Sequence, residues 1–465
     1  MSNKSALTVG LVSLGCSKNL VDTQVMCGVL LTEGIELAPN PDEADAVLIN
    51  TCAFIQSARD EADFEIRRAL GLKKEGKIGA VIVSGCLAQR YGKEAAEKYP
   101  EVDAWLGIDH LEELADIVKR VTRKGAARKR AILDVSVPAT SLFEPRVPAL
   151  SLAGGPFAYL KIAEGCNHTC AYCAIPGIRG RLRSRRIDDI AAEAGELLAT
   201  GVRELDVVAQ DVTAYGRDRR GGGRLPELLR ALDGFGGKYW TRILYGYPSY
   251  VDDALLDCFA SLKHLCRYID MPIQHSHPDI LRAMRRADTI PHVASLPARL
   301  RAACPGIAIR TTCLVGFPGE TEEHFRHLCD YVRESRFDAL GVFAFSREEG
   351  TAAAEMPNQV PAEIAEERRD RLMRIQRSVQ REAAKVRVGL KTTAMLLRPA
   401  SRGRWVARTE WQAPDVDGVT YVSGCGRKAA PGDFVRVEIG GVRGYDLYAT
   451  TCQGGTGSGK RVSKC

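Results

Sequence analysis

The sequence has no run of roughly 18 uninterrupted apolar residues, the length that a membrane-spanning helix needs. Its first residues, MSNKSALTVGLVSLG, also lack the basic segment and the long apolar stretch of a secretory signal. We therefore expect a cytoplasmic protein with no membrane partner. Because the cytoplasm keeps thiols reduced, the 15 cysteines are not expected to form a disulfide framework, which leaves metal binding or catalysis as their predicted use.

The chain also lacks a large excess of positive or negative charge. The chain has 65 Lys and Arg residues against 58 Asp and Glu residues, which gives a net charge of +7 over 465 residues. A dedicated nucleic-acid-binding protein clusters its basic residues, whereas the only obvious basic run here is RKGAARKR at residues 123–130. We interpret this run as a solvated helix end before a linker, so the charge gives little support for a nucleic-acid partner.

A chain of this length exceeds what one hydrophobic core usually organises, and its hydrophobic pattern changes along the chain. Over residues 7–123, short β-branched runs (VGLVSLG, AVLINT, AVIVSG) alternate with helical patterns, which predicts an N-terminal doubly wound α/β domain. Residues 139–156 are rich in Pro, Gly and Ser and show neither period, so they are expected to link two domains.

Six further strand–helix units over residues 152–385 predict a central partial (β/α)6 barrel. A charged helical segment at residues 361–388 is expected to connect it to a small antiparallel β-barrel over residues 388–453, in which Asp417 and Gly418 would mark a hairpin. Residues 454–465 are rich in Gly, Ser and Lys and predict a disordered tail, in which the last cysteine has no structural role.

Three cysteines, Cys166, Cys170 and Cys173, lie in the segment EGCNHTCAYCAIP directly after a predicted strand. A loop in this position can wrap around an inorganic core, and thiolates are the ligands that iron–sulfur clusters prefer. Three protein ligands on a four-iron cluster leave one iron open. That iron can chelate S-adenosylmethionine (SAM), whose reductive cleavage gives a 5'-deoxyadenosyl radical. The spacing therefore predicts a 4Fe-4S cluster that generates a radical from SAM.

A structural zinc site and chance spacing of buried thiols are the alternatives to such a cluster. Zinc usually takes four ligands in paired C-x-x-C units, and the fourth ligand here would be His168 or a remote residue. We therefore favour the iron–sulfur cluster. Gln210, Gln274 and Arg310 lie at or beside the ends or starts of predicted strands, where the ligands of such barrels gather, and are our candidates for contacts to SAM.

A second set of three cysteines, Cys16, Cys52 and Cys86, follows three predicted strands of the N-terminal domain. The carboxyl ends of such strands share one edge of the sheet, so we expect the three thiols to converge in one crevice. Glycine precedes Cys16 and Cys86 and would let a bulky ligand approach the backbone closely. We predict a second 4Fe-4S cluster, whose open iron can hold exogenous sulfur.

The alternative is that these three thiols are small buried side chains, since free cysteine packs like a small hydrophobic residue. We expect that packing role for six other cysteines: Cys27, Cys258, Cys266, Cys304, Cys313 and Cys329.

The C-x-x-x-C-x-x-C spacing with Tyr172 before the last cysteine resembles the motif of the radical SAM superfamily, and this resemblance places Tyr172 near the adenine of SAM. The three predicted domains, in this order, resemble the methylthiotransferase family, whose last module is called TRAM. Segments such as SLGCSKNLVDTQ, GCLAQRYG, IDMPIQHSHPDILRAMRR and GFPGETEEHF look like its RimO branch, which modifies ribosomal proteins. The branch that modifies tRNA more often reads GCQMN where this chain has GCSKN, and PVQSGS where it has PIQHSH.

The resemblance implies transfer of a methylthio group to the β-carbon of an aspartate in small-subunit ribosomal protein S twelve. One SAM molecule would methylate sulfur at the N-terminal cluster, and a second, at the central cluster, would supply the radical that removes hydrogen from the aspartate. An electron donor and a sulfur donor are further expected partners. A tRNA adenosine methylthiotransferase is the nearest alternative, with tRNA as partner, and a non-catalytic iron–sulfur redox sensor or RNA-binding protein is the alternative from another class.

The C-terminal module tests the choice between protein and RNA only in part. TRAM modules elsewhere bind RNA, yet between Lys391 and Thr451 there are nine basic residues against six acidic ones, a net of +3. Glu410, Asp415 and Asp417 would favour docking of a basic ribosomal protein, although a role as turn residues fits them equally well. The chain departs from the family in having Ala53 where glycine is common after the second N-terminal cysteine, a position that is not a ligand.

Overall fold

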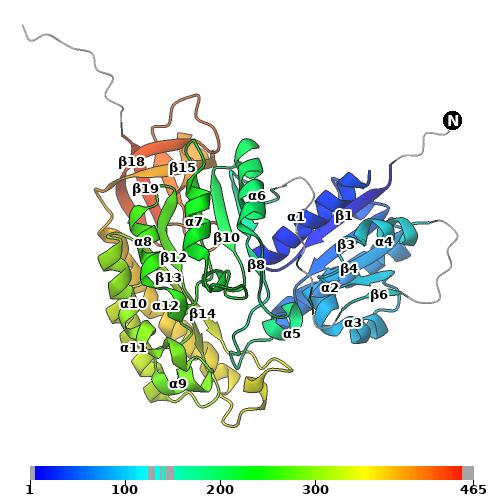
Figure 1. Ribbon diagram of the computed structural model, residues 1–465, viewed down its shortest axis with the longest axis horizontal. Helices are drawn as coiled ribbons and strands as arrows, with labels where there is room; N and C mark the ends of the chain where they lie inside the picture. The colour runs from blue at the N-terminus through cyan, green and yellow to red at the C-terminus, as the bar shows by residue number, and fades with distance from the viewer. Residues whose placement is uncertain (1–5, 124–130, 137–138, 141, 143–150, 453–465) are drawn as a thin grey trace, which may run out of the picture.

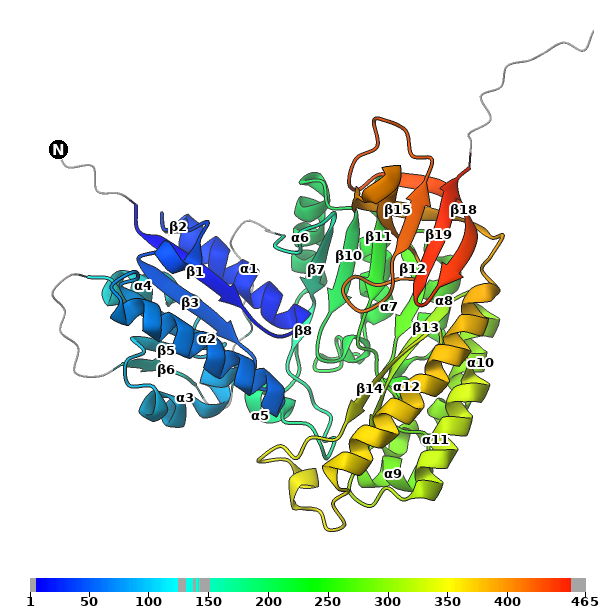
Figure 2. The same cartoon turned by 180° about the vertical axis from the view of Figure 1, so that it is seen from behind.

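The computed structural model describes residues 6–123, 131–136, 139–140, 142 and 151–452, which form three domains (Figure 1). The N-terminal domain lies on one side of a large central domain, and a small β-barrel packs against one end of the central domain (Figures 1 and 2). The basic run after Arg123, most of the expected linker and the expected tail lie outside the described residues. None of the described helices is long and apolar enough to span a membrane.

The N-terminal domain is built on a six-stranded parallel sheet in the order β2-β1-β3-β4-β5-β6. Its central strands β3 and β4 come from the runs AVLINT and AVIVSG, and every residue of both strands is buried. The elements of this domain are β1 (Thr8–Ser13), α1 (Ser17–Thr32), β2 (Glu36–Leu37), η1 (Pro41–Glu43), β3 (Ala46–Thr51), α2 (Gln56–Lys74), β4 (Ala80–Gly85), α3 (Cys86–Lys98), β5 (Ala104–Leu106), α4 (Leu114–Val121) and β6 (Ile132–Asp134).

Both faces of this sheet carry a hydrophobic core, because alternate side chains of a strand point to opposite faces. Val47 and Val81 pack on one face with Ile66 of α2, in a cluster that also includes α3. Leu48 and Ile82 pack on the other face in a cluster that includes side chains of α1 and α4. The prediction of a doubly wound α/β domain is confirmed.

The central domain is a six-stranded parallel sheet in the order β14-β13-β12-β11-β10-β7, and all six strands were expected from the sequence. Strands β14 and β7 form the two edges, so the sheet is a partial barrel. The elements are β7 (Phe157–Lys161), β8 (Ala163–Glu164), α5 (Ile175–Arg179), β9 (Arg183–Ser184), α6 (Ile187–Ala199), β10 (Glu204–Val208), η2 (Val212–Ala214), α7 (Leu225–Asp233), β11 (Trp240–Ile243), η3 (Pro248–Tyr250), α8 (Asp253–Ser261), β12 (Leu265–Asp270), α9 (Pro278–Ala283), η4 (Ala287–Thr289), α10 (Ile290–Ala303), β13 (Ala308–Val315), α11 (Glu322–Ser335), β14 (Ala339–Ala344), η5 (Ala352–Glu355) and α12 (Ala362–Lys385).

The long charged helix α12 leads into the C-terminal domain, a closed five-stranded barrel in the order β15-β16-β17-β19-β18. Its core contains Leu396, Val422 and Ile439. The elements are β15 (Lys391–Pro399), η6 (Ser401–Gly403), β16 (Trp405–Thr409), β17 (Thr420–Ser423), β18 (Phe434–Arg443) and β19 (Asp446–Thr451).

The hairpin predicted at Asp417 and Gly418 is present in this barrel, but its loop is longer than two residues. Strands β16 and β17 are antiparallel neighbours, but Asp417 and Gly418 do not form a two-residue hairpin between them. A loop of residues 410–419 connects the strands instead, because this loop reaches out to the central domain, where Asp417 accepts a hydrogen bond from the hydroxyl of Tyr268 at 2.7 Å.

The inner face of the central sheet is covered by the two other domains. Tyr159 and Tyr268 point to this face and pack in one cluster with Val21 of α1 and Ala413 of the 410–419 loop. The opposite face of the sheet is covered by the helices of the central domain. The N-terminal domain is therefore held against the open side of the partial barrel.

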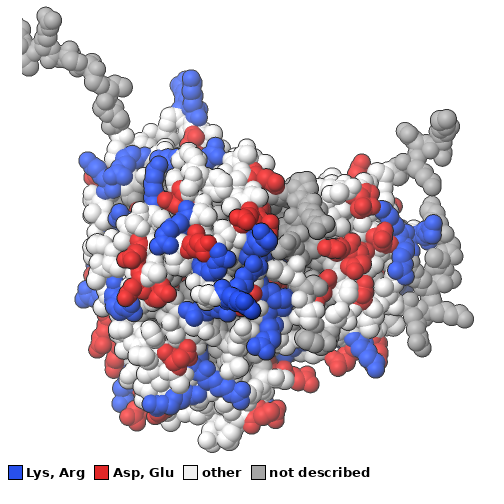
Figure 3. Space-filling model, in the orientation of Figure 1, with Lys and Arg blue, Asp and Glu red and all other residues white. Residues whose placement is uncertain are grey.

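Basic and acidic side chains are interspersed on the face of the molecule that Figure 3 shows. On this face the described residues present no large field of one sign, in agreement with the small net charge. Surface charge therefore does not by itself indicate a nucleic-acid partner.

Candidate active site

The six cysteines of the two predicted sets line a single pocket of about 450 Å³ between the N-terminal and central domains. The walls come from both domains, and the lining residues are Cys16, Lys18, Cys52, Phe54, Cys86, Cys166, His168, Cys170, Tyr172, Cys173, Ile175, Arg179, Gln210, Asp211, Tyr245, Gly246, Tyr247, Pro272, Gln274, Arg286 and Phe343.

Cys16, Cys52 and Cys86 follow the carboxyl ends of β1, β3 and β4, which are adjacent strands of the sheet. They therefore converge, as expected. Both glycines before these cysteines are also required by the protein itself. Gly15 and Gly85 have positive φ angles of 92° and 91°, and a Cβ atom on Gly15 would lie 2.6 Å from Cβ of Cys52. The missing side chain therefore makes room for a neighbouring loop of the protein, while close approach of a ligand stays a prediction.

The loop that carries Cys166, Cys170 and Cys173 is fixed by backbone hydrogen bonds. The amide of Cys166 donates to the carbonyl of Gly180 at 3.1 Å, and the amide of Cys173 donates to the carbonyl of Cys170 at 3.1 Å. The amide of Ala171 donates to the carbonyl of Met284 at 3.0 Å, beyond α9. The three thiols are partly exposed and face the pocket. Three thiolates on a folded loop are a donor set that suits a cluster with one open iron.

Arg179 joins the two cysteine sets through a buried ion-pair network that the sequence pattern did not reveal. Its Nη2 atom lies 3.3 Å from Sγ of Cys86 and 2.9 Å from a carboxylate oxygen of Asp22, both in the N-terminal domain. Its Nη1 atom donates to both carboxylate oxygens of Glu164, at 3.0 and 3.1 Å, in the strand before the central cysteines. The Arg179 side chain is 1% exposed. Because a buried guanidinium needs acceptors from both domains here, the network fixes the domains relative to each other.

Arg286 lies beside a cysteine of the central set, as Arg179 lies beside a cysteine of the N-terminal set. Arg286 was not identified from the sequence either. Its Nη1 atom lies 3.6 Å from Sγ of Cys170, its Nη2 atom donates to the carbonyl of Pro272 at 3.0 Å, and its guanidinium stacks over the ring of Tyr247. The segment RAMRR contains several arginines, and the sequence does not indicate which of them is buried, because burial depends on how α9 packs.

Burial disfavours the thiolate form of most of these cysteines. It raises the pKa of Cys86, Cys166 and Cys173 to about 12 in each case. Cys16 is the exposed member of its set; partial loss of hydration still opposes its ionisation, but the positive charges of Lys18 and Arg179 and backbone N–H donors outweigh it and lower the pKa. Binding of a cluster must therefore displace protons from buried thiols. The positive charges of the arginine side chains beside Cys86 and Cys170 favour this loss of protons.

Three of the four candidate SAM contacts line the pocket: Tyr172, Gln210 and Gln274. Gln210 donates to Glu164 at 2.7 Å, and its buried carbonyl oxygen has no hydrogen-bond partner among the described residues. Gln274 has a left-handed backbone with φ of 68°. An amide oxygen that is buried at the pocket without a partner is suited to accept a hydrogen bond from a ligand.

The prediction for Arg310 is wrong. Arg310 is the third residue of β13, far from the carboxyl end of the strand, and it does not line the pocket. Its guanidinium donates to Asp417 of the C-terminal barrel at 3.2 Å and lies 3.5 Å from Asp270. A residue near the start of a strand faces the opposite end of the barrel from the ligand loops, and this accounts for the error.

His168, the residue considered as a fourth zinc ligand, is engaged elsewhere. Its Nε2 atom is 2.7 Å from a carboxylate oxygen of Asp211, and its ring stacks on Tyr247 with centroids 3.7 Å apart.

Acidic residues of the C-terminal barrel that were considered for docking form contacts with the central domain. Asp415 accepts a hydrogen bond from Tyr159 at 2.8 Å, and Asp417 binds Tyr268 and Arg310. The carboxylates of Asp415 and Asp417 therefore attach the C-terminal barrel to the central domain, which contradicts a docking role for these two residues. The carboxylate of Glu410 accepts a hydrogen bond of 3.5 Å from the amide of Arg267, and its docking role stays a prediction.

The six cysteines expected to serve only in packing are all buried. The six pocket cysteines differ from these buried cysteines in their location, because each pocket cysteine lies in a loop or at the start of a helix at the domain interface.

Family comparisons divide the chain in the same three parts. Residues 8–107 match the model described as Uncharacterized protein family UPF0004, residues 160–332 match the Radical SAM superfamily, and residues 388–452 match the TRAM domain. Among solved structures, the radical SAM methyltransferase TsrM from Kitasatospora setae aligns with a TM-score of 0.54 at 17% identity, covering 75% of this chain and 74% of that chain. The radical SAM enzyme OxsB aligns with a TM-score of 0.52 at 14% identity, covering 80% and 56%. These likenesses confirm the fold.

Relatives of similar length are far more similar in sequence. A protein of Desulforamulus reducens named Ribosomal protein uS12 methylthiotransferase RimO is 43% identical over 96% of this chain and 100% of its own. Proteins of the same name from Pelotomaculum thermopropionicum and Syntrophus aciditrophicus are 44% and 45% identical, over 96% and 95% of this chain and 99% and 98% of their own. The chain therefore belongs to the RimO family of radical SAM methylthiotransferases.

Proposed function

We propose that this protein transfers a methylthio group to the β-carbon of an aspartate in ribosomal protein uS12. The observation that carries the proposal is the single pocket lined by two sets of three cysteines from two domains. A radical generator alone needs only one set. A second set across the same pocket would hold a sulfur source beside the radical source.

We propose that Cys166, Cys170 and Cys173 hold a 4Fe-4S cluster, and that Cys16, Cys52 and Cys86 hold a second one. When bound, the first cluster and SAM would supply the 5'-deoxyadenosyl radical that removes a hydrogen atom from the substrate, and the second cluster would hold the exogenous sulfur that another SAM methylates. Tyr172, Gln210 and Gln274 are the proposed contacts to SAM, since all three line the pocket.

Arg179 and Arg286 then act as positioning residues. Each places one guanidinium against one cysteine sulfur, Cys86 or Cys170, and each is at most 4% exposed. A thiolate-ligated cluster is negatively charged, so a buried positive charge beside each set stabilises the loaded state. The link from Arg179 to Glu164 also sets the distance between the two sets.

The mouth of the pocket fits a polypeptide substrate. Phe54 and Phe343 line it and are 37% and 56% exposed, which is unusual for phenylalanine. Phe54 comes from the N-terminal domain and Phe343 from edge strand β14 of the central domain. Exposed aromatic side chains at a pocket rim bind a protein segment by burial of apolar surface.

The proposal includes a cytoplasmic location, an electron donor and a sulfur donor. It assigns residues 7–123 to the methylthiotransferase domain, 152–385 to the radical SAM domain and 388–453 to the TRAM domain.

A deletion strain of the source organism tests the substrate. We expect mass spectrometry to show uS12 without the added methylthio mass, while methylthiolated tRNA nucleosides persist. Complementation with the wild-type gene should restore the mass. Loss of the tRNA modification with intact uS12 modification would assign the enzyme to tRNA instead.

A further inference from the structure

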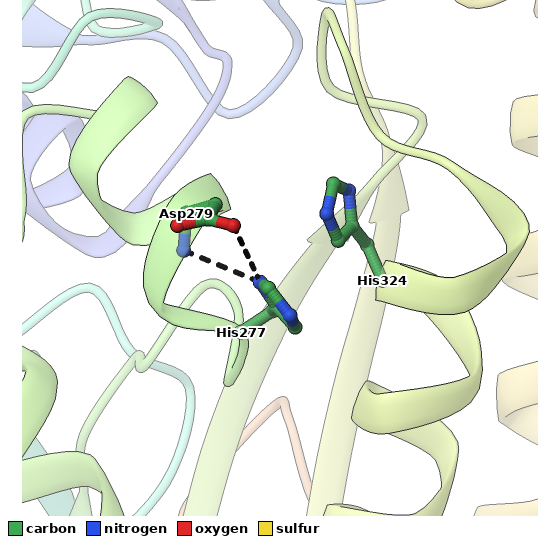
Figure 4. Close-up of side chains that lie close together, drawn as sticks. All are labelled: His277, Asp279 and His324. Carbon is green, nitrogen blue, oxygen red and sulfur yellow. Dashed lines mark hydrogen bonds and ion pairs between the residues drawn. The ribbon is translucent and has the colours of Figure 1, made fainter.

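Three potential metal ligands lie together away from the cysteine pocket. His277 precedes α9, Asp279 is its second residue, and His324 is the third residue of α11 (Figure 4). One ligand atom from each of the three side chains lies within 4.8 Å of the other two. His277 and His324 are partly exposed and Asp279 is exposed, so an ion can reach them from solvent.

We propose that His277, Asp279 and His324 form a binding site for a divalent transition-metal ion such as Zn²⁺. Two imidazoles and one carboxylate are a ligand set that zinc and neighbouring metals take in proteins, with a water molecule completing the coordination. The hard ions Mg²⁺ and Ca²⁺ prefer oxygen ligands, so the two histidines select against them.

The rings are already directed toward one another. The centroids of His277 and His324 are 4.3 Å apart, and Nδ1 of His277 is 3.9 Å from a carboxylate oxygen of Asp279. His327, one helical turn beyond His324, has its centroid 5.0 Å from that of His277. Ser276 is 2.9 Å from Nδ1 of His327 and so orients this ring beside the group. Binding of one ion would require the three side chains to rotate toward one another, because their ligand atoms are now up to 4.8 Å apart.

Both histidines also hold helix-capping positions. Nδ1 of His277 accepts a hydrogen bond from the amide of Asp279, and Nδ1 of His324 accepts one from the amide of Thr321, both at 3.2 Å. A neutral imidazole has one lone pair, so coordination replaces each of these long hydrogen bonds with a metal–nitrogen bond. One carboxylate oxygen of Asp279 accepts a hydrogen bond from Arg282 at 2.6 Å, which leaves its second oxygen toward His277.

The ring environment favours the neutral form that a metal requires. Burial lowers the pKa of His277, and the nearby rings of His324 and His327 lower it further, while Asp279 and Glu323 act in the opposite direction. At neutral pH His277 therefore offers a lone pair without first losing a proton.

The site has a structural consequence for the cluster loop. An ion bound there would tie α9 to α11. The segment from Gln274 to Arg286 contains α9. Directly after this helix, the carbonyl of Met284 accepts a hydrogen bond from the amide of Ala171, which lies between two cysteines of the central set. Occupancy would thus restrain the segment that carries Gln274 and Arg286 to the pocket.

The test uses untagged full-length protein with both clusters in place, freed of loose metal with a chelating resin and titrated anaerobically with Zn²⁺. We expect one equivalent to bind and to raise the unfolding temperature. His277→Asn and His324→Gln are the informative variants, since asparagine and glutamine keep the respective caps but remove the imidazoles. Each should weaken binding by about 100-fold or more. His292→Gln on α10 is the matched control and should bind like the wild type.

Co²⁺ gives a second measurement that separates this site from the cysteines. Ligation by nitrogen and oxygen predicts d–d absorption bands without a thiolate-to-cobalt charge-transfer band. Equal affinity in all three histidine variants, or a thiolate charge-transfer band that they retain, would overturn the proposal.

Discussion

At the scale of single residues, the site depends on two buried arginines as much as on six cysteines. Arg179 is 1% exposed and Arg286 is 4% exposed, and taking a guanidinium out of water costs several kcal/mol unless acceptors surround it. For Arg179 the acceptors are Asp22, Glu164 and the side-chain oxygen of Asn19 at 2.6 Å. The same charge serves the fold and the N-terminal cysteine set.

Replacing Arg179 with glutamine should therefore lower the free energy of unfolding by about 3 kcal/mol, because Asp22 and Glu164 stay buried and lose one of their two shared cationic partners, the other being Lys161. Chemical denaturation under anaerobic conditions measures this. Arg181→Gln, two residues away on an exposed side chain, is the control and should change stability by less than about 0.5 kcal/mol. Equal effects of the two variants would contradict the role given to Arg179.

The sequence predicts the cysteines of the site well and its charges poorly. Cys16, Cys52 and Cys86 could be expected to converge, because parallel strands end at one edge of a sheet. Arg179 could not be found in this way, because its partners Asp22 and Glu164 are more than 140 residues apart and meet only when the domains dock. Arg310 was assigned to the wrong end of the barrel for the related reason that strand limits were uncertain by a few residues.

At the scale of elements, the turns after β1 and β4 bring the N-terminal cysteines together. Gly85 has φ of 91°, and a Cβ atom there would lie 2.2 Å from the side-chain oxygen of Asn50 and 2.6 Å from the carbonyl of Thr51. The strand thus turns sharply into α3, and Cys86 becomes the first residue of that helix. No other residue type fits the turn without moving the loop of Cys52.

Gly85→Ala should therefore destabilise the protein by more than the about 1–2 kcal/mol that a left-handed backbone alone costs an alanine. Gly76→Ala is the matched control, because Gly76 has φ of 74° but open space around the added methyl group. The difference between the two losses, measured by denaturation, gives the cost of the steric clash together with the cost of the extended backbone of Gly85, whose ψ is −154°. Equal losses would mean that close packing of this turn has no energetic role.

Long elements with a clear period were predicted correctly, and short ones were missed. The runs AVLINT and AVIVSG and the helix α12 are long enough to show a period of 2 or 3.6. Strands β2, β5 and β6 have only two or three residues each, which is too few for any period. They exist because they extend a sheet that the longer strands have already formed.

At the scale of the whole molecule, a fully buried charge cluster attaches the C-terminal barrel to the central domain. Glu204 of β10 accepts hydrogen bonds from Arg242 of β11 at 2.8 Å and from Arg408 of β16 at 3.0 Å. Burial disfavours the charge of Glu204, but Arg408 and Arg242 outweigh it and lower its pKa. Asp206 lies beside this pair, and burial together with the charge of Glu204 raises its pKa well above the ordinary value.

The two carboxyl groups should thus respond differently to removal of their charge. Glu204→Gln removes the carboxylate that Arg242 and Arg408 share and leaves only Asp206, 3.6 Å from Arg242, so it should cost about 3 kcal/mol of unfolding free energy. Asp206→Asn removes a carboxyl group whose pKa burial and the charge of Glu204 raise, and it should cost less than about 1 kcal/mol.

The pH dependence checks the same assignment. A carboxyl group whose pKa is raised by folding stabilises the fold below its unfolded pKa and loses that contribution as pH rises. Wild-type stability should therefore decline above about pH 4 through Asp206, and Asp206→Asn should remove that part of the slope. An unchanged slope in Asp206→Asn, or a large loss of stability, would show that Asp206 is ionised.

The domain order could be predicted from the sequence, whereas the contacts between domains could not. Asp415 and Asp417 have the composition of turn residues, and only the structure shows that both bind tyrosines of the central sheet. Contacts of this kind join residues that are far apart in the chain and leave no periodic pattern.

The most direct measurement follows a uS12 peptide that contains the target aspartate, incubated anaerobically with the cluster-loaded enzyme, SAM and dithionite. Mass spectrometry should show one methylthio group on the aspartate β-carbon together with 5'-deoxyadenosine. A variant with Cys16, Cys52 and Cys86 all changed to alanine should still form 5'-deoxyadenosine and leave the peptide without sulfur. Methylthiolation by that variant would contradict the assignment of the second cysteine set as the sulfur-inserting half of the site.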